Sequence, residues 1–196
     1  FKIGYLGIEN TLIEKVKQNN PNVRFIDCSE GIEAGHEHDH DHADCNHGAG
    51  HDGGDPHIWS SPATVKIMTE NMYKTVIELD SVNKDFYKAN FTELQAELNE
   101  ADRIIKSYIA AAPSKTFVIY HPALSYFAEE YGLKQLTIEH DGKAPSPIQL
   151  KQLIDEAKKE GAKVVFIQKE YDTKAEADYS GRDLEVFQIF DRMHKA

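Results

Sequence analysis

The stretch TFVIYHPALSYFAEEYG, residues 116–132, holds the signals that decide the fold. Its first five residues are all β-branched or aromatic, which predicts a buried strand. The residues from 122 to 131 predict a short helix, ended by Gly132. The order of strand and helix then repeats, with strands expected at 135–139, 163–168 and 185–190 and helices at 146–160 and 173–180. Strands that alternate with helices form parallel sheets, so we predict an α/β lobe over residues 112–196.

The part of the chain before this lobe is mostly helical in pattern. Apolar residues recur at helical spacing over 81–111, which predicts a helix of about 30 residues, roughly 45 Å long. That length exceeds a usual domain helix, so we expect it to connect two lobes. Ser61-Pro62 predicts the start of another helix. Residues 1–28 have the pattern strand, helix, strand, with the helix capped at Asn10-Thr11, so we expect a second α/β lobe over 1–80.

Composition and charge exclude several classes of function. The 196 residues carry a net charge of −11, which disfavours nucleic acid as a partner because phosphates require clustered Lys and Arg. No apolar run approaches the roughly 20 residues of a transmembrane helix. The sequence has no Gly-rich phosphate loop, no His-Glu-x-x-His pair and no nucleophile elbow, so we predict that the chain is not an enzyme.

A His-rich segment at 34–54 is the strongest indication of chemistry. Imidazole is a good zinc ligand, and the interleaved carboxylates add oxygen donors and a negative field. The segment lacks large apolar residues, so we expect a surface loop that binds metal weakly at several sites, because ordering its backbone costs on the order of 1 kcal/mol per residue. A solvated polar linker is the alternative interpretation. The six histidines of this segment are His36, His38, His40, His42, His47 and His51.

Two further histidines are candidate ligands, and because lone histidines are more often structural, a structural role is the alternative for each. His57 lies in DPHIW, residues 55–59, between a rigid Pro and two large apolar residues. His121 follows the strand at 116–120, and ligands of parallel sheets bind beyond the carboxyl ends of strands. The cysteines Cys28 and Cys45 leave two possibilities open, a disulfide or a role for Cys45 as a soft metal ligand.

The His-rich loop, DPHIWSSP (55–62), HPALSYF (121–127) and GKAPSP (142–147), in this order, resemble the metal-binding solute-binding proteins of zinc and manganese ABC importers. In that family two α/β lobes with parallel sheets are joined by one long rigid helix, and the metal lies between them. The resemblance implies that His57 is the second and His121 the third of four ligands. Asp191 lies near the position of the fourth, and the first has no counterpart. We therefore expect an incomplete first lobe and an affinity below that of the complete family site.

The resemblance also implies a function. A monomeric extracytoplasmic receptor, on the periplasmic or extracellular side of the membrane and held there by a lipid anchor, would deliver Zn²⁺ to an ABC-transporter permease. His rather than Glu at the third-ligand position, with the His-rich loop, resembles the zinc branch and agrees with the preference of imidazole for zinc. The alternatives are a manganese-type receptor, a stand-alone zinc buffer or chaperone acting through the loop, a metallohydrolase, and a surface adhesin of the same family.

Overall fold

The computed structural model describes residues 1–33, 54–139, 143–167 and 185–188. The chain divides into two compact units, Phe1–Ile105 and Lys106–Ala196. The division falls within the long helix predicted over 81–111. We describe each unit by itself.

The first unit begins with helix α1 (Gly7–Asn19), and the strands predicted on either side of it are wrong. They reduce to one parallel bridge between Lys2 and Asp27. Gly4 has a φ of 123°, which takes the chain out of the extended conformation directly after that bridge. The predicted cap at Asn10-Thr11 is also wrong, because the helix begins three residues earlier. Among the described residues of this unit the bridge has no further strand beside it, so it makes no sheet.

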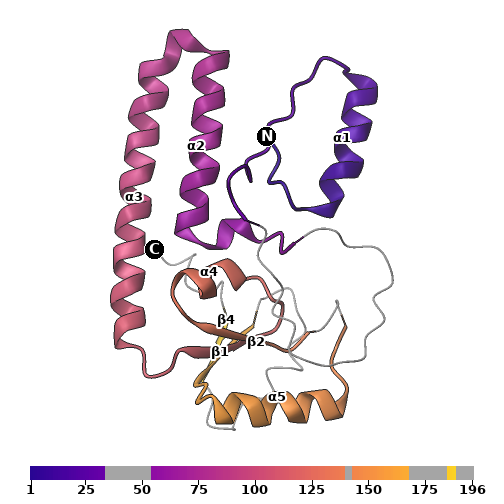
Figure 1. The fold of residues 1–196 in the computed structure, drawn as a ribbon, viewed down its shortest axis with the longest axis vertical. Coiled ribbons are helices and arrows are strands. Elements are labelled where there is room, and N and C mark those ends of the chain that lie inside the picture. Colours follow the sequence, from indigo (N-terminus) through magenta and orange to yellow (C-terminus); the bar gives the residue numbers. More distant parts are fainter. Residues whose placement is uncertain (34–53, 140–142, 168–184, 189–196) are drawn as a thin grey trace. The chain divides into compact units, whose positions relative to one another are not determined.

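Two long antiparallel helices follow, and the second extends past the end of the first unit (Figure 1). Helix α2 (Pro62–Leu79) begins where Ser61-Pro62 predicted it, with the Ser61 side chain as its cap. The short turn η1 (Ile58–Ser60) precedes α2, and the short turn η2 (Ser81–Asn83) leads from α2 into α3 (Lys84–Ala111). Its 28 residues span about 42 Å, so the long helix is confirmed. Tyr73 of α2 stacks on Phe91 of α3, with 4.4 Å between the ring centroids.

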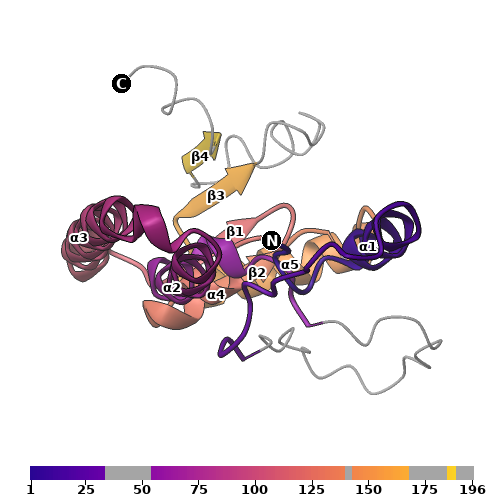
Figure 2. The same ribbon diagram turned by 90° about the horizontal axis from the view of Figure 1, so that it is seen from above.

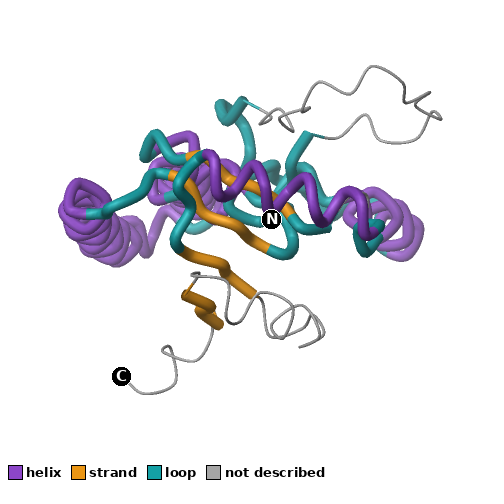
Figure 3. The backbone as a smooth tube through the Cα atoms, turned by 90° about the horizontal axis from the view of Figure 1, so that it is seen from below, coloured by secondary structure: helices purple, strands orange, loops and turns teal. Residues whose placement is uncertain are grey.

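The second unit contains a four-stranded parallel sheet, as predicted. Its strands are β1 (Thr116–Ile119), β2 (Lys134–Thr137), β3 (Val164–Ile167) and β4 (Glu185–Gln188). All pairings are parallel and the spatial order is β2-β1-β3-β4, so β1 and β3 are the inner strands. Figure 2 shows this order from above, and Figure 3 shows the same strands from below.

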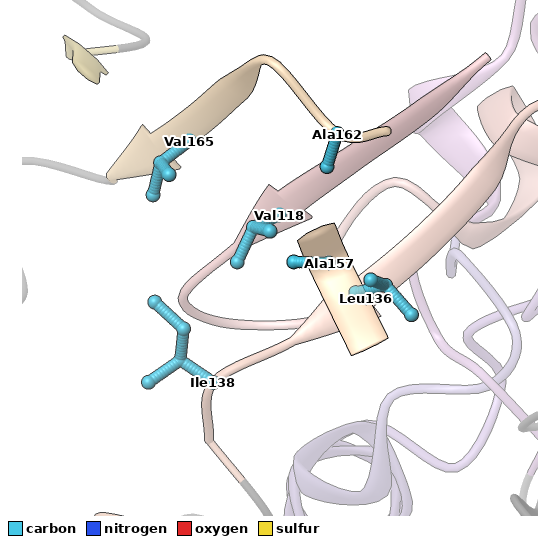
Figure 4. Packing of buried hydrophobic residues seen from close by; sticks show 6 residues of the cluster. All are labelled: Val118, Leu136, Ile138, Ala157, Ala162 and Val165. Atoms are coloured by element: carbon cyan, nitrogen blue, oxygen red, sulfur yellow. The ribbon is translucent and has the colours of Figure 1, made fainter. Parts of the chain in front are cut away.

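Helices cover both faces of this sheet, with α4 (Ser125–Glu130) on one side and α5 (Pro147–Lys159) on the other (Figure 1). Every residue of β1 is buried, as expected for a strand covered on both faces. The face toward α5 packs through six side chains, which are Val118, Leu136, Ile138, Ala157, Ala162 and Val165 (Figure 4). The opposite face packs Phe117 and Ile119 against Ala128 of α4.

The ends of the two helices follow the predicted signals. Gly132 takes a φ of 62° directly after α4, and the next N–H, that of Leu133, donates to the carbonyl of Ala128 over 2.8 Å. Ser146 and Gln149 form a reciprocal capping box at the start of α5. The helix predicted at 173–180 lies outside the described residues. Within the described ranges, no helix is long and apolar enough to cross a membrane.

Candidate metal centre

His57 is held by the carboxylate two residues before it in the chain. Oδ1 of Asp55 accepts the backbone N–H of His57 over 2.9 Å and lies 2.6 Å from its ring nitrogen Nδ1. A carboxylate offers only acceptors, so Nδ1 carries the proton of that bond. The Asp55 side chain is 4% exposed and that of His57 15%. One buried oxygen atom therefore fixes both the backbone and the ring of His57.

The short turn after His57 is itself anchored in the first unit. Ile58 is completely buried, and its N–H donates to the carbonyl of Pro56 over 2.9 Å. The hydroxyl of Thr64, in the first turn of α2, donates to the carbonyls of Ile58 and Ser61. Trp59 meets the His57 ring edge-on, with 5.3 Å between centroids. These contacts fix the position from which the imidazole projects.

His121 lies two residues after β1, at the carboxyl end of an inner strand of the sheet. Its Nδ1 lies 3.1 Å from Oε1 of Glu139, whose side chain is 9% exposed. Glu139 reaches this position because β1 and β2 are parallel neighbours. The pairing continues past the strand ends, where the N–H of Glu139 donates to the carbonyl of Tyr120 over 3.0 Å.

A side chain of β2 also holds the loop that follows His121. The amide oxygen of Gln135 accepts the N–H of Leu124 over 3.1 Å, and its amide nitrogen donates to Oγ of Ser125 over 3.1 Å. The loop therefore has fixed contacts on both sides of the turn into α4.

Each pair can orient an imidazole toward a metal ion. When Nδ1–H donates to a carboxylate, the lone pair lies on Nε2, which is the nitrogen that can ligate. Metal-bound histidines typically donate their other N–H to a carboxylate or carbonyl in this manner, which fixes the tautomer and raises the basicity of the ligand. Neutral imidazole nitrogen in such a pair suits zinc better than harder cations such as manganese or magnesium.

The structure describes only some of the predicted site residues. His57 belongs to the first unit and His121 to the second, and each lies beside a buried carboxylate of its own unit. The six loop histidines, Cys45 and Asp191 lie outside the described residues, so their predicted roles stay predictions. Cys28 is buried, with a free thiol. Among the side chains that the structure describes, no group of three or more His, Cys, Asp or Glu is arranged to hold a metal.

Sequence reasoning missed Asp55 and Glu139 as partners of the two histidines. A signal for Asp55 was present, because an Asp side chain often bonds the backbone two residues further on. Glu139 was harder to find. The prediction put His121 and Glu139 at the ends of two parallel strands, but only the strand order shows that these strands are neighbours.

Comparison with known proteins shows the family to which the chain belongs. Residues 1–184 match the family model described as ZnuA, zinc-uptake complex component A, periplasmic. The chain belongs to the ZnuA family. The match includes both histidine motifs and all but the last residues, and the resemblance to metal-binding solute-binding proteins is confirmed.

Individual members of the ZnuA family show how far the similarity extends. The high-affinity zinc uptake system protein ZnuA of Bacillus subtilis is 31% identical over 148 residues, which are 74% of this chain and 46% of that protein. A crystal structure of ZnuA superposes with a TM-score of 0.79 at 34% identity, covering 94% of this chain and 68% of the other. A zinc-bound ZnuA deletion mutant gives 0.77 at 33% identity, with the same coverage. The chain spans about half the length of the Bacillus protein, and its fold is that of the family.

Proposed function

We propose that the chain acts as a zinc-binding receptor outside the cytoplasm and delivers Zn²⁺ to the permease of an ABC importer. The observation that carries this proposal is the paired geometry of His57 with Asp55 and of His121 with Glu139. Each ring is oriented with Nδ1 toward a buried carboxylate, in the arrangement that imidazole ligands of zinc adopt. Family membership supports zinc as the cargo and the periplasmic side of the membrane as the location. The lipid anchor and the monomeric state stay predictions.

We assign the two sets of histidines different tasks. His57 and His121 form the specific site through Nε2, and water or residues outside the described ranges complete the coordination. The histidines of the segment 36–51 collect zinc at looser, accessory positions. A rigid imidazole needs little ordering on binding, whereas each site in a polar segment must order its backbone. The specific pair should therefore bind more tightly than any single site in the segment.

A carrier role is favoured over hydrolysis by what the nearby carboxylates do. A zinc hydrolase needs a general base beside the metal-bound water. Asp55 and Glu139, the buried carboxylates beside the two histidines, accept hydrogen bonds from the Nδ1 side of the rings. That position orients a ligand and does not face a water on the metal.

The proposal can be tested by replacing both histidines with Ala and titrating the chain with zinc in a calorimeter. The double variant His57→Ala/His121→Ala should lose the tightest binding event and keep the weaker events of the His-rich segment. Tyr108→Ala, which removes an exposed ring from a described residue with no assigned metal role, serves as the control and should leave the whole isotherm unchanged. An isotherm of the double variant that matches the wild type would refute the assignment.

A further inference from the structure

We infer that Asp55 and Glu139 are positioning residues that preset the metal-binding tautomer of His57 and His121 in the zinc-free protein, each within its own unit. This inference rests on the proposed function, since it concerns the same two histidines. It goes further because it gives a role to two acidic residues that do not themselves contact the ion.

The Asp55 contact is local and has two parts. Oδ1 accepts both the backbone N–H and the Nδ1–H of His57, at 2.9 and 2.6 Å. The segment between the two residues contains Pro56, which restricts the backbone. The ring therefore cannot rotate to present Nδ1 to a metal without losing a short bond to a buried carboxylate.

The Glu139 contact depends on the sheet. Glu139 is 18 residues from His121 along the chain, and it meets the ring only through the parallel pairing of β1 with β2. The N–H of Glu139 bonds to Tyr120, the residue before the histidine, so backbone and side chain approach the same ligand. Its bond to the ring, 3.1 Å, is longer than that of Asp55. Both rings nevertheless have the same chemical arrangement, although the two carboxylates come from unrelated structural elements.

This arrangement has a consequence for zinc affinity. If both rings already carry the proton on Nδ1, zinc binding needs no exchange of tautomer and no rotation of the ring. Loss of such an outer partner typically lowers metal affinity by roughly tenfold to a hundredfold. Asp55→Asn and Glu139→Gln keep an acceptor oxygen of the same shape but lose the carboxylate charge. Asp55→Ala and Glu139→Ala lose the acceptor altogether.

The test begins with the zinc-free chain labelled with ¹⁵N, in which two-bond nitrogen–proton correlations distinguish the two tautomers of each ring. We expect Nδ1–H at both His57 and His121. Glu139→Ala should move His121 toward the Nε2–H form and leave His57 unchanged, and Asp55→Ala should do the reverse. A purely structural role for the carboxylates would not produce this residue-specific exchange.

The second readout is the dissociation constant for zinc. Asp55→Asn and Glu139→Gln should each weaken the tight event by about tenfold, and the Ala variants by up to about a hundredfold. The controls are Asp85→Asn and Glu129→Gln, which make the same chemical change at exposed positions of the same units and should leave the constant unchanged. Thermal unfolding of every variant identifies any loss of fold. Should Asp55→Ala fail to fold, the wild-type spectrum and the Asn variant still decide the question.

The inference would be overturned by Nε2–H tautomers in the zinc-free wild type, or by Asn and Gln variants that bind zinc as tightly as the controls. Failure of the proposed function has a different signature. In that case His57→Ala and His121→Ala would leave the tight event intact, whatever tautomers the rings adopt.

Discussion

Truncation of Ile58 to Ala should destabilise the first unit more than any exposed substitution of the same kind. The Ile58 side chain is completely buried, and Ile58 is the residue directly after His57. The change removes three carbon atoms, which at about 0.8 kcal/mol each corresponds to a loss of about 2.4 kcal/mol. The cavity left behind adds to this loss, and measured changes of this kind lie between about 2 and 5 kcal/mol. We expect the free energy of unfolding to fall by about 3 kcal/mol.

The single tryptophan of the chain, Trp59, is the natural probe for this experiment because it is the next residue. Its side chain is partly exposed, so its fluorescence should change on unfolding in urea. With a urea slope of about 2 kcal/mol per molar, a loss of 3 kcal/mol lowers the midpoint by about 1.5 M. Ile8→Ala, at a position in the same unit that is 65% exposed, should change stability by less than about 0.5 kcal/mol. Equal midpoints for the two variants would refute the claim that Ile58 anchors the His57 turn.

Three further predictions concern the start of the chain. Gly4→Ala should lower the free energy of unfolding in urea by at least about 2 kcal/mol, because φ is positive there and an added Cβ would lie 2.1 Å from a neighbouring side chain. Gly7→Ala, which has open space around it, should not destabilise the chain. Equal losses for the two variants would contradict this prediction. Burial raises the pKa of the Cys28 thiol, so iodoacetamide should label this thiol far more slowly in the native chain than in urea. Mass spectrometry measures the labelling rate, and equal rates in the two conditions would refute the burial. Burial also acts to raise the pKa of Asp27, but hydrogen bonds, that of Lys2 the largest, outweigh it and hold the pKa below its ordinary value. The stability that Asp27 contributes is present above the unfolded-state pKa and is lost as the pH falls through the lower folded-state pKa. The destabilisation by Asp27→Asn at pH 7 should therefore disappear in strong acid. A difference in unfolding free energy between wild type and variant that does not change with pH would contradict this prediction.

The second unit could be predicted from the sequence because its signals are local and agree with one another. The β-branched and aromatic run at 116–119 and the helical pattern at 146–160 each identify an element within a few residues. The alternation of these elements then indicates a parallel sheet. Strand order carries no such local signal. The contact between His121 and Glu139 depends on that order, which is why the prediction did not contain it.

The first unit departs from prediction because its local signals conflict with its packing. Residues 1–6 have strand-like composition, but Gly4 adopts a conformation closed to other residues. The carboxylate of Glu9, in the first turn of α1, accepts the N–H groups of Ile3 and Gly4 at 2.6 and 2.8 Å. Backbone groups that a strand would pair with a neighbour are thus bonded to a side chain of the helix. The periodicity of the sequence does not show that these backbone groups bond to a side chain in place of a neighbouring strand.

His57 and His121 were chosen as candidate ligands because of their neighbours in the sequence and not because of their own spacing. DPHIW indicated an imidazole held in one place, and the strand end at Tyr120 indicated a position where parallel sheets bind ligands. The structure shows a carboxylate beside each ring. The histidines of 36–51 indicated which metal the chain binds, but they did not indicate which residues form the specific site.

The central claim is that His57 and His121 serve one zinc site that does not depend on the His-rich segment. The most direct test is a calorimetric zinc titration of the chain lacking residues 36–51, with and without His121→Ala. The account predicts one tight zinc per chain in the deletion protein and loss of that event when His121 is replaced. Loss of tight binding on deletion alone, or its persistence after the His121 substitution, would contradict the account.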